Sequence, residues 1–199
     1  MKSKILNRLR GAEEFVSGQQ LCEEFGVSRT AVWKAINQLK EEGYEIEAVQ
    51  NKGYCLKDVP DVLGESEIKS RLHTRWAGQT LYYYDEIDST NTQIKRLAEE
   101  DAPHGTLAVA DYQSRGKGRR GRAWDSPHGS AIYMSILFRP EIRPDRASML
   151  TLVIGLSVTQ AIRSNLGLQA QIKWPNDVVL NGKKISRNSD GNERADELY

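Results

Sequence analysis

Apolar residues near the start of the chain recur at helical spacing and predict three short helices. The first covers residues 4–10, and the second begins at Ser17, which stands three residues before Gln20 in the arrangement of a capping box. Ser28 is the predicted cap of the third helix. On this third helix the apolar residues recur at the i, i+4, i+7 spacing of one buried face: Val32, Ile36 and Leu39.

Alternation of apolar and polar residues replaces the helical spacing between residues 45 and 56. Two alternating segments flank the turn residues Asn51-Lys52-Gly53, which predicts a hairpin. Three helices followed by a hairpin predict a winged helix-turn-helix, which we assign to residues 1–60. The pattern breaks at Asp58-Val59-Pro60, and we place a domain boundary there.

The second region, residues 61–185, mixes helices and strands without a regular βαβ repeat. Apolar runs predict strands at 81–84, 106–111 and 131–138 and a strand that ends at Trp174, with helices within 61–73 and over 92–100 and 148–166. This order predicts an α+β domain on a mixed sheet.

Composition and charge limit the function classes. The chain has 199 residues and a net charge of +1, which excludes attraction of a polyanion by overall charge. The longest mostly apolar stretch, Met149 to Val158, is shorter than the roughly 20 residues of a membrane-spanning helix. No export signal is visible, and the two cysteines, Cys22 and Cys55, form no disulfide or zinc pattern. We therefore expect a cytoplasmic protein.

The outward face of the third predicted helix carries side chains of the types that donate hydrogen bonds to phosphates and base edges. They are Ser28, Arg29, Thr30, Trp33, Lys34, Asn37 and Gln38. Lys52 adds a cation at the tip of the wing. Residues 1–60 hold nine Lys and Arg against nine Asp and Glu, so a winged helix used for protein contacts stays an alternative. The clustering on one helix face favours DNA binding.

Residues 114–122, SRGKGRRGR, combine five cations with three glycines and contain no acid. The segment fits GxGxxG, but Pro127 and Gly129 stand where a Rossmann loop needs the first turns of its helix. No GK[ST] of a P-loop follows. Glycines permit close approach to a ligand, and arginines offer planar forks for phosphate oxygens. The segment predicts a nucleotide site, with a solvated surface loop or a second nucleic-acid contact as alternatives.

Two further clusters favour the nucleotide site over these alternatives. Asp88-Ser89-Thr90-Asn91 places hydroxyls and an amide where a strand gives way to a helix, although alone it is only a helix cap. Lys173-Trp174-Pro175-Asn176-Asp177 ends a strand with a cation, an aromatic ring, an amide and a carboxylate. Lys183-Lys184 follow an Asn181-Gly182 turn. The order and spacing of these clusters are together more specific than any one of them.

With these motifs the chain resembles the bacterial biotin protein ligases of the bifunctional kind that also repress the biotin operon. The resemblance covers residues 1–185 and rests on the winged helix, on DSTN at 88–91, on YQSRGKGRRGRAW at 112–124 and on KWPNDVVLNGKK at 173–184. It implies a class II synthetase-like catalytic domain. It also implies that ATP and biotin give biotinyl-AMP, which a lysine of a biotin carboxyl carrier protein then attacks, and that the adenylate-loaded form dimerises on operator DNA.

The resemblance also implies residue roles. Biotin is expected to contact Ser89, Thr90, Asn91, Gln113, Lys117, Gly118, Arg119 and Lys184. ATP or the adenylate is expected to contact Arg120, Arg122, Trp124, Lys173, Asn176 and Asp177, with Asp177 also a ligand of Mg²⁺. Arg119 and Lys184 are the implied catalytic residues, because joining two anions requires cations that cancel repulsion and stabilise the leaving pyrophosphate. Lys117 stands where some relatives have arginine, which keeps the charge and loses the bidentate fork.

The chain departs from the family pattern after Ile185. The family continues with a strand of the type Ala-Gly-Ile-Leu-x-Glu, a GIGxN segment and a small β-barrel, whereas residues 186–197 carry no large apolar side chain and cannot fill a central strand. One codon set for Ser186 to Arg194, read one base later, spells Ala-Gly-Ile-Leu-Thr-Glu-Met-Asn. We therefore interpret the tail at 186–199 as a frameshift product. The nucleotide sequence of codons 185–194 tests this interpretation. An engineered truncation and a divergent tail are the alternatives.

The leading interpretation is a truncated ligase and repressor, inactive in the extreme case, with an incomplete catalytic domain at 61–185. Loss of interior strands would expose the apolar face of the predicted helix at 148–166, so we expect a poorly folded second domain. A second interpretation is a DNA-binding regulator that senses biotin or its adenylate without ligation. A third is a pseudogene product with no stable fold.

Overall fold

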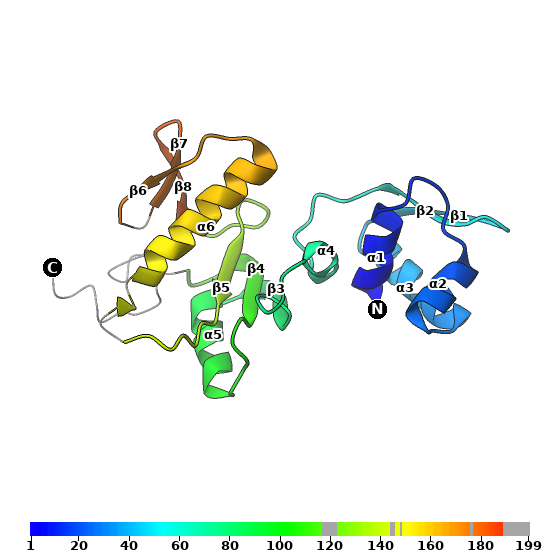
Figure 1. The fold of residues 1–199 in the computed structure, drawn as a ribbon, viewed down its shortest axis with the longest axis horizontal. Coiled ribbons are helices and arrows are strands. Elements are labelled where there is room, and N and C mark those ends of the chain that lie inside the picture. The colour runs from blue at the N-terminus through cyan, green and yellow to red at the C-terminus, as the bar shows by residue number, and fades with distance from the viewer. Residues whose placement is uncertain (117–122, 144–145, 148, 176, 189–199) are drawn as a thin grey trace. The chain divides into compact units, whose positions relative to one another are not determined.

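The computed structural model describes residues 1–116, 123–143, 146–147, 149–175 and 177–188 (Figure 1). The chain forms two compact units, one of Met1–Gly116 with Asp125–Phe138 and one of Lys117–Trp124 with Arg139–Tyr199. The predicted boundary at residue 60 falls inside the first unit and stays a prediction. Among the described residues no helix is long and apolar enough to cross a membrane.

A winged helix opens the first unit. Its elements are α1 (Lys2–Arg10), α2 (Gly18–Phe25), α3 (Arg29–Glu41), β1 (Glu45–Val49) and β2 (Gly53–Asp58), and β1 and β2 are antiparallel.

Both predicted caps are confirmed. Ser17 and Gln20 exchange hydrogen bonds in a capping box, and the Ser28 hydroxyl accepts from the Ala31 amide at 3.2 Å. Each cap supplies an acceptor to an amide at the start of a helix, where no carbonyl is within reach. These local interactions fix where α2 and α3 begin.

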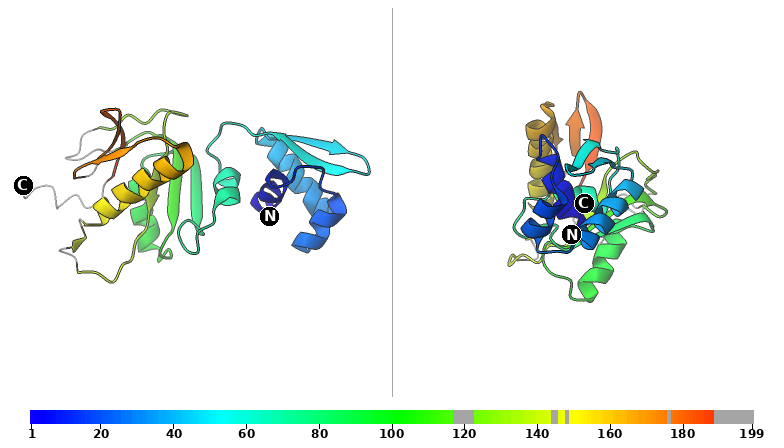
Figure 2. Two further views of the ribbon diagram at one scale, coloured as in Figure 1. Left: turned by 45° about the horizontal axis from the view of Figure 1, so that its top comes forward. Right: turned by 90° about the vertical axis from the view of Figure 1, so that its right-hand side faces the viewer.

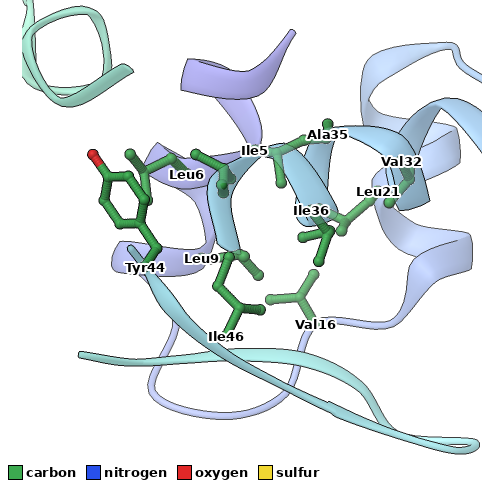
Figure 3. Packing of buried hydrophobic residues seen from close by; sticks show 11 residues of the cluster. Ile5, Leu6, Leu9, Val16, Leu21, Val32, Ala35, Ile36, Tyr44 and Ile46 are labelled. Atoms are coloured by element: carbon green, nitrogen blue, oxygen red, sulfur yellow. The ribbon is translucent and has the colours of Figure 1, made fainter. Parts of the chain in front are cut away.

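The apolar faces of the three helices meet over the wing (Figure 3). The predicted core residues Val32, Ile36 and Leu39 are at most 1% exposed, and Ile46 of the wing closes the cluster. Each such side chain stabilises the fold by about 1.5–3 kcal/mol. Gly53, with φ of 112°, lets the wing approach the backbone of Val16, because a Cβ there would lie 2.1 Å from the Val16 carbonyl oxygen.

Helix α4 (Glu65–Arg71) packs against α1 through a partly buried ionic cluster. Arg10 reaches it from the end of α1: its Nη2 lies 2.6 Å from Glu67 Oε2, and its Nη1 donates to Ser70 Oγ at 2.7 Å. The Tyr44 hydroxyl donates to the same Glu67 oxygen at 3.0 Å, and Arg71 pairs with the other oxygen. The sequence indicated this helix only from apolar spacing and gave no sign of these partners.

A mixed sheet forms the rest of the first unit. Strands β3 (Leu81–Ile87) and β4 (Leu107–Gln113) are parallel, β5 (Tyr133–Ile136) runs antiparallel to β4, and the connection from β3 to β4 carries α5 (Thr90–Glu99). Helix α5 packs against β4 and β5 (Figure 2). The fold is α+β with a mixed sheet, as predicted.

The second unit contains α6 (Met149–Leu166) and an antiparallel sheet of β6 (Gln171–Lys173), β7 (Asp177–Leu180) and β8 (Lys183–Arg187) in that order. The Asn181-Gly182 turn joins β7 to β8, with φ of 50° and 75°. The sequence predicted the turn but missed both strands, because each is short and β8 is rich in lysine. Strand β8 takes in Ser186 and Arg187 of the predicted tail, and residues 189–199 lie outside the described residues.

The expected exposure of apolar side chains on the long helix is present in α6. Val153 is 58% exposed and Leu156 is 48% exposed. Gly155 and Thr159 of the same helix are buried, and a Cβ on Gly155 would lie 3.4 Å from Asn188 Nδ2. Asn188 therefore packs closely on α6 just after β8 ends.

Substitution of Glu67 by glutamine should destabilise the first unit by about 1–3 kcal/mol, the usual value of hydrogen bonds to a charged group. Burial alone raises the pKa of the Glu67 carboxyl, but the hydrogen bonds from its three partners outweigh burial and hold the pKa below its usual range. The native pKa is thus below the unfolded one, near 4.3, so this stability is present above about pH 4.3 and is lost as the pH falls through the native pKa.

Urea unfolding of the full chain between pH 3 and 7, followed by circular dichroism, measures this effect. In Glu67→Gln the loss at neutral pH should be accompanied by a flatter pH dependence. The control is Glu65→Gln, the same change on the same helix at an exposed pair with Lys69, which should cost under about 0.5 kcal/mol. Equal losses in the two variants would contradict the assignment.

Candidate functional site

A network of buried and half-buried polar side chains lies where α5 begins. Ser89 and Thr90 are each 4% exposed, at the start of the helix. The Thr90 amide and hydroxyl both donate to Gln113 Oε1, at 2.9 Å and 3.1 Å. The Ser135 hydroxyl of β5 donates to Thr90 Oγ1 at 3.0 Å. Three of the predicted biotin contacts, Ser89, Thr90 and Gln113, are therefore brought together, with Asn91 half-buried beside them.

Asp88 anchors the entry to this helix. Its Oδ2 lies 2.7 Å from Arg96 Nη2, its Oδ1 accepts from the Ser89 amide at 2.7 Å, and its carbonyl accepts from the Arg115 amide at 2.8 Å. The Arg96 guanidinium, more than the local amide bond, holds the pKa of Asp88 below its usual range. The carboxylate thus links the DSTN motif to the beginning of the basic segment.

The chain that returns after the basic segment also reaches the network. Gln113 Nε2 donates to Ser126 Oγ at 3.1 Å, and the Gln113 amide donates to the Ser126 carbonyl at 3.3 Å. Ser126 is 1% exposed. The Gln113 side chain therefore joins the start of α5 to the returning chain, with its oxygen toward Thr90 and its nitrogen toward Ser126.

The second unit gathers predicted nucleotide contacts of its own. Lys184 Nζ lies 2.7 Å from Asp177 Oδ1 and 6.0 Å from the centre of the Trp124 ring. Lys173 faces Asp177 across the β6–β7 ladder. This group joins two cations, a carboxylate and an aromatic ring, a set that suits the phosphates and base of a nucleotide. The predicted residues Lys117, Gly118, Arg119, Arg120, Arg122 and Asn176 lie outside the described residues.

A protein-held metal site does not emerge from the described part of the chain, where no three His, Cys, Asp or Glu side chains lie close enough to hold an ion. Asp177, the predicted Mg²⁺ ligand, pairs with Lys184. Mg²⁺ is commonly held by one or two carboxylates together with substrate phosphates. Among the described residues, the single carboxylate of Asp177 therefore fits an ion that arrives on nucleotide phosphates.

The predicted DNA-contacting residues lie on the solvent side of the winged helix. Trp33 is 56% exposed, Asn37 is half-buried, and the others are exposed: Ser28, Arg29, Thr30, Lys34, Gln38 and Lys52. Arg29 Nη2 donates to Gln19 Oε1 of α2 at 3.1 Å, and Lys52 Nζ lies 5.9 Å from the Phe15 ring centre. These side chains are placed for contact with a partner, since the core uses the opposite face of α3.

Sequence reasoning missed Ser126 and Ser135. One signal existed for Ser135, because alternation along β5 places it on the same face as buried Tyr133. Ser126 carried no such signal, since it lies outside any regular element. The contact between Asp111 and His128 was also missed, although both residues flank the basic segment closely in sequence.

The chain thus has a winged helix-turn-helix module followed by an α+β domain with hydrogen-bonded polar side chains at the start of α5. Residues 2–55 match the HTH domain model, and residues 83–187 match the model of the biotin/lipoate A/B protein ligase family. The chain belongs to the biotin/lipoate A/B protein ligase family.

Among curated relatives, the bifunctional ligase/repressor BirA of Bacillus spizizenii is 48% identical over 175 residues, which are 88% of this chain and 54% of the relative. The protein of the same name from Escherichia coli is 37% identical over 87% of this chain and 52% of its own length. The chain thus spans about half the length of these relatives. Among solved structures, the biotin protein ligase from Aquifex aeolicus with biotin and ATP covers 55% of this chain and 45% of its own, at 39% identity and a TM-score of 0.48.

Proposed function

We propose that this chain is a biotin protein ligase that also represses transcription of the biotin operon. It joins biotin to AMP, transfers the biotinyl group to a lysine of a biotin carboxyl carrier protein, and binds operator DNA through its winged helix. The observation that carries this proposal is the partly buried network of Thr90, Gln113 and Ser126, a set of hydrogen-bonding groups within the ligase-family segment.

The polar network is the proposed biotin subsite. The ureido ring of biotin has both donors and acceptors, and hydroxyl and amide side chains can serve either role. Ser89, Thr90, Asn91 and Gln113 supply such groups at the N-terminus of α5. The positive end of the helix dipole also favours the partly negative carbonyl of the ring. Lys117, Gly118 and Arg119 then lie over the biotin carboxylate in our proposal.

The nucleotide is assigned to the group around Lys184. Trp124 stacks near the adenine, and the other proposed contacts are Arg120, Arg122, Lys173, Asn176 and Asp177, with Mg²⁺ carried on the phosphates. Arg119 and Lys184 act as the catalytic cations. They cancel the repulsion between carboxylate and α-phosphate and stabilise the charge on departing pyrophosphate, which is electrostatic catalysis. We propose that the adenylate-bound form binds DNA as a homodimer.

Exchange of labelled pyrophosphate into ATP, dependent on biotin, tests the ligase assignment because it isolates the adenylation half-reaction. Biotin-dependent exchange by this chain would show that its incomplete catalytic domain still forms the adenylate, and Arg119→Gly should then slow the exchange by about 10²- to 10³-fold, the usual effect of removing one transition-state donor. The control is Arg75→Gly, an exposed arginine in the first unit, which should exchange at the unchanged rate. A folded chain that binds biotin without exchange would instead be a biotin sensor.

DNA binding by the winged helix is tested with the promoter region of a biotin synthesis operon, by fluorescence anisotropy at several salt concentrations. Lys34→Ala should weaken binding to any sequence and lower the salt slope by about 1, because one phosphate contact is lost. Lys40→Ala removes an exposed lysine from the last turn of the same helix and should leave the slope unchanged. Equal changes in both variants would argue against a defined DNA-binding face.

A further inference from the structure

An aspartate–histidine pair stands beside the proposed biotin subsite and has no role in the function argued above. Asp111 lies on β4, two residues before Gln113, and His128 lies on the chain that returns after the basic segment. His128 Nδ1 lies 2.8 Å from Asp111 Oδ2. The two residues thus bridge the same two segments as Gln113 and Ser126.

Both carboxylate oxygens of Asp111 make hydrogen bonds. While Oδ2 faces His128, Oδ1 accepts from the Gly129 amide at 3.1 Å. The imidazole, followed by the Gly129 amide, holds the pKa of Asp111 below its usual range. The Tyr112 ring stacks on the His128 ring at 4.7 Å between centroids and 17° between planes, which restricts rotation of the imidazole. A single carboxylate therefore fixes two consecutive residues of the returning chain.

The position of the returning chain affects the orientation of the Gln113 side-chain amide. A carboxamide can present its oxygen or its nitrogen in a given direction, and its neighbours decide which. Thr90 supplies two donors on one side, so the Gln113 nitrogen must find its acceptor on the other side, at Ser126 Oγ. Ser126 lies two residues before His128. The position of Ser126, and with it the orientation of the Gln113 amide, depends on where the returning chain is held.

We propose that Asp111 and His128 are positioning residues of the biotin subsite: their bridge between β4 and the returning chain holds Ser126 in place and so sets the Gln113 amide for biotin. The proposal rests on the proposed function for the identity of the ligand. The contacts between Asp111, His128 and Gly129 do not depend on which ligand binds. Neither residue touches biotin in this account, and each acts through Ser126 and Gln113.

The test uses the 199-residue chain, without ligand and with biotin. In Asp111→Ala, hydrogen exchange by NMR should become faster at the Gly129 amide and at the Gln113 side-chain amide, and biotin titrated by calorimetry should bind about tenfold more weakly, within the hundredfold that a misplaced group can cost. His128→Ala should give the same biotin defect, and the double variant should be no weaker than either single variant, since the pair acts as one unit. Asp111→Asn keeps one acceptor oxygen and should fall between Asp111→Ala and the unsubstituted chain.

Asp125→Asn is the matched control, because it removes one exposed carboxylate from the same returning segment. It should leave both exchange rates and the biotin affinity unchanged. An unchanged Gln113 side-chain exchange in Asp111→Ala would overturn the positioning role, and so would additive effects in the double variant. Failure of the unsubstituted chain to bind biotin would overturn the proposed function instead, and the two exchange rates would still decide whether the bridge orients Gln113.

Discussion

The side-chain amide of Gln113 can satisfy its donor and acceptor groups only while three segments keep their places. Its oxygen accepts from the first residue of α5, its nitrogen donates to Ser126 on the returning chain, and its backbone belongs to β4. A fully buried polar group that loses a partner costs about 1–3 kcal/mol, and the half-buried Gln113 amide bears part of that cost when one of its contacts is broken. The sheet, the helix and the returning chain are therefore ordered together, and the site exists as a consequence of that order.

The pairing of β3 with β4 explains why the proposed site residues lie at one edge of the sheet. Strands β3 and β4 are parallel, so their carboxyl ends meet at one side of the sheet, where DSTN leaves β3 and the basic segment leaves β4. The Ser114 amide donates to the Ile87 carbonyl at 2.9 Å and joins the two exits. A basic segment that begins at the end of β4 needs only a short length of chain to reach a ligand bound at the start of α5. In the proposed biotin subsite, neutral polar side chains contact the ligand and the basic segment supplies the charge.

Local signals predicted local structure well. The caps at Ser17 and Ser28 and the turn at Asn181-Gly182 depend on residues within a few positions of each other, so the sequence displays them. The Gln113 contact with Thr90 spans 23 positions and the Arg10 contact with Glu67 spans 57, and neither is visible without the fold that brings them together. Physical reasoning predicted the DSTN residues as a site for a polar ligand or as a helix cap only, and their assignment to biotin came from the family resemblance.

Helix α4 ties the two functional regions of the first unit together because its two faces have different partners. Glu67 and Ser70 face Arg10 of the winged helix, whereas Ile68 packs with Leu81 and Val109 of the mixed sheet. Packed interfaces resist gradual deformation, so a shift of the sheet under α4 would have to move α4 or break its bonds to Arg10. Breaking those bonds would deprive a partly buried carboxylate of one of its cationic partners, which is destabilising. Helix α4 is therefore held to the winged helix by ionic side chains and to the mixed sheet by apolar ones.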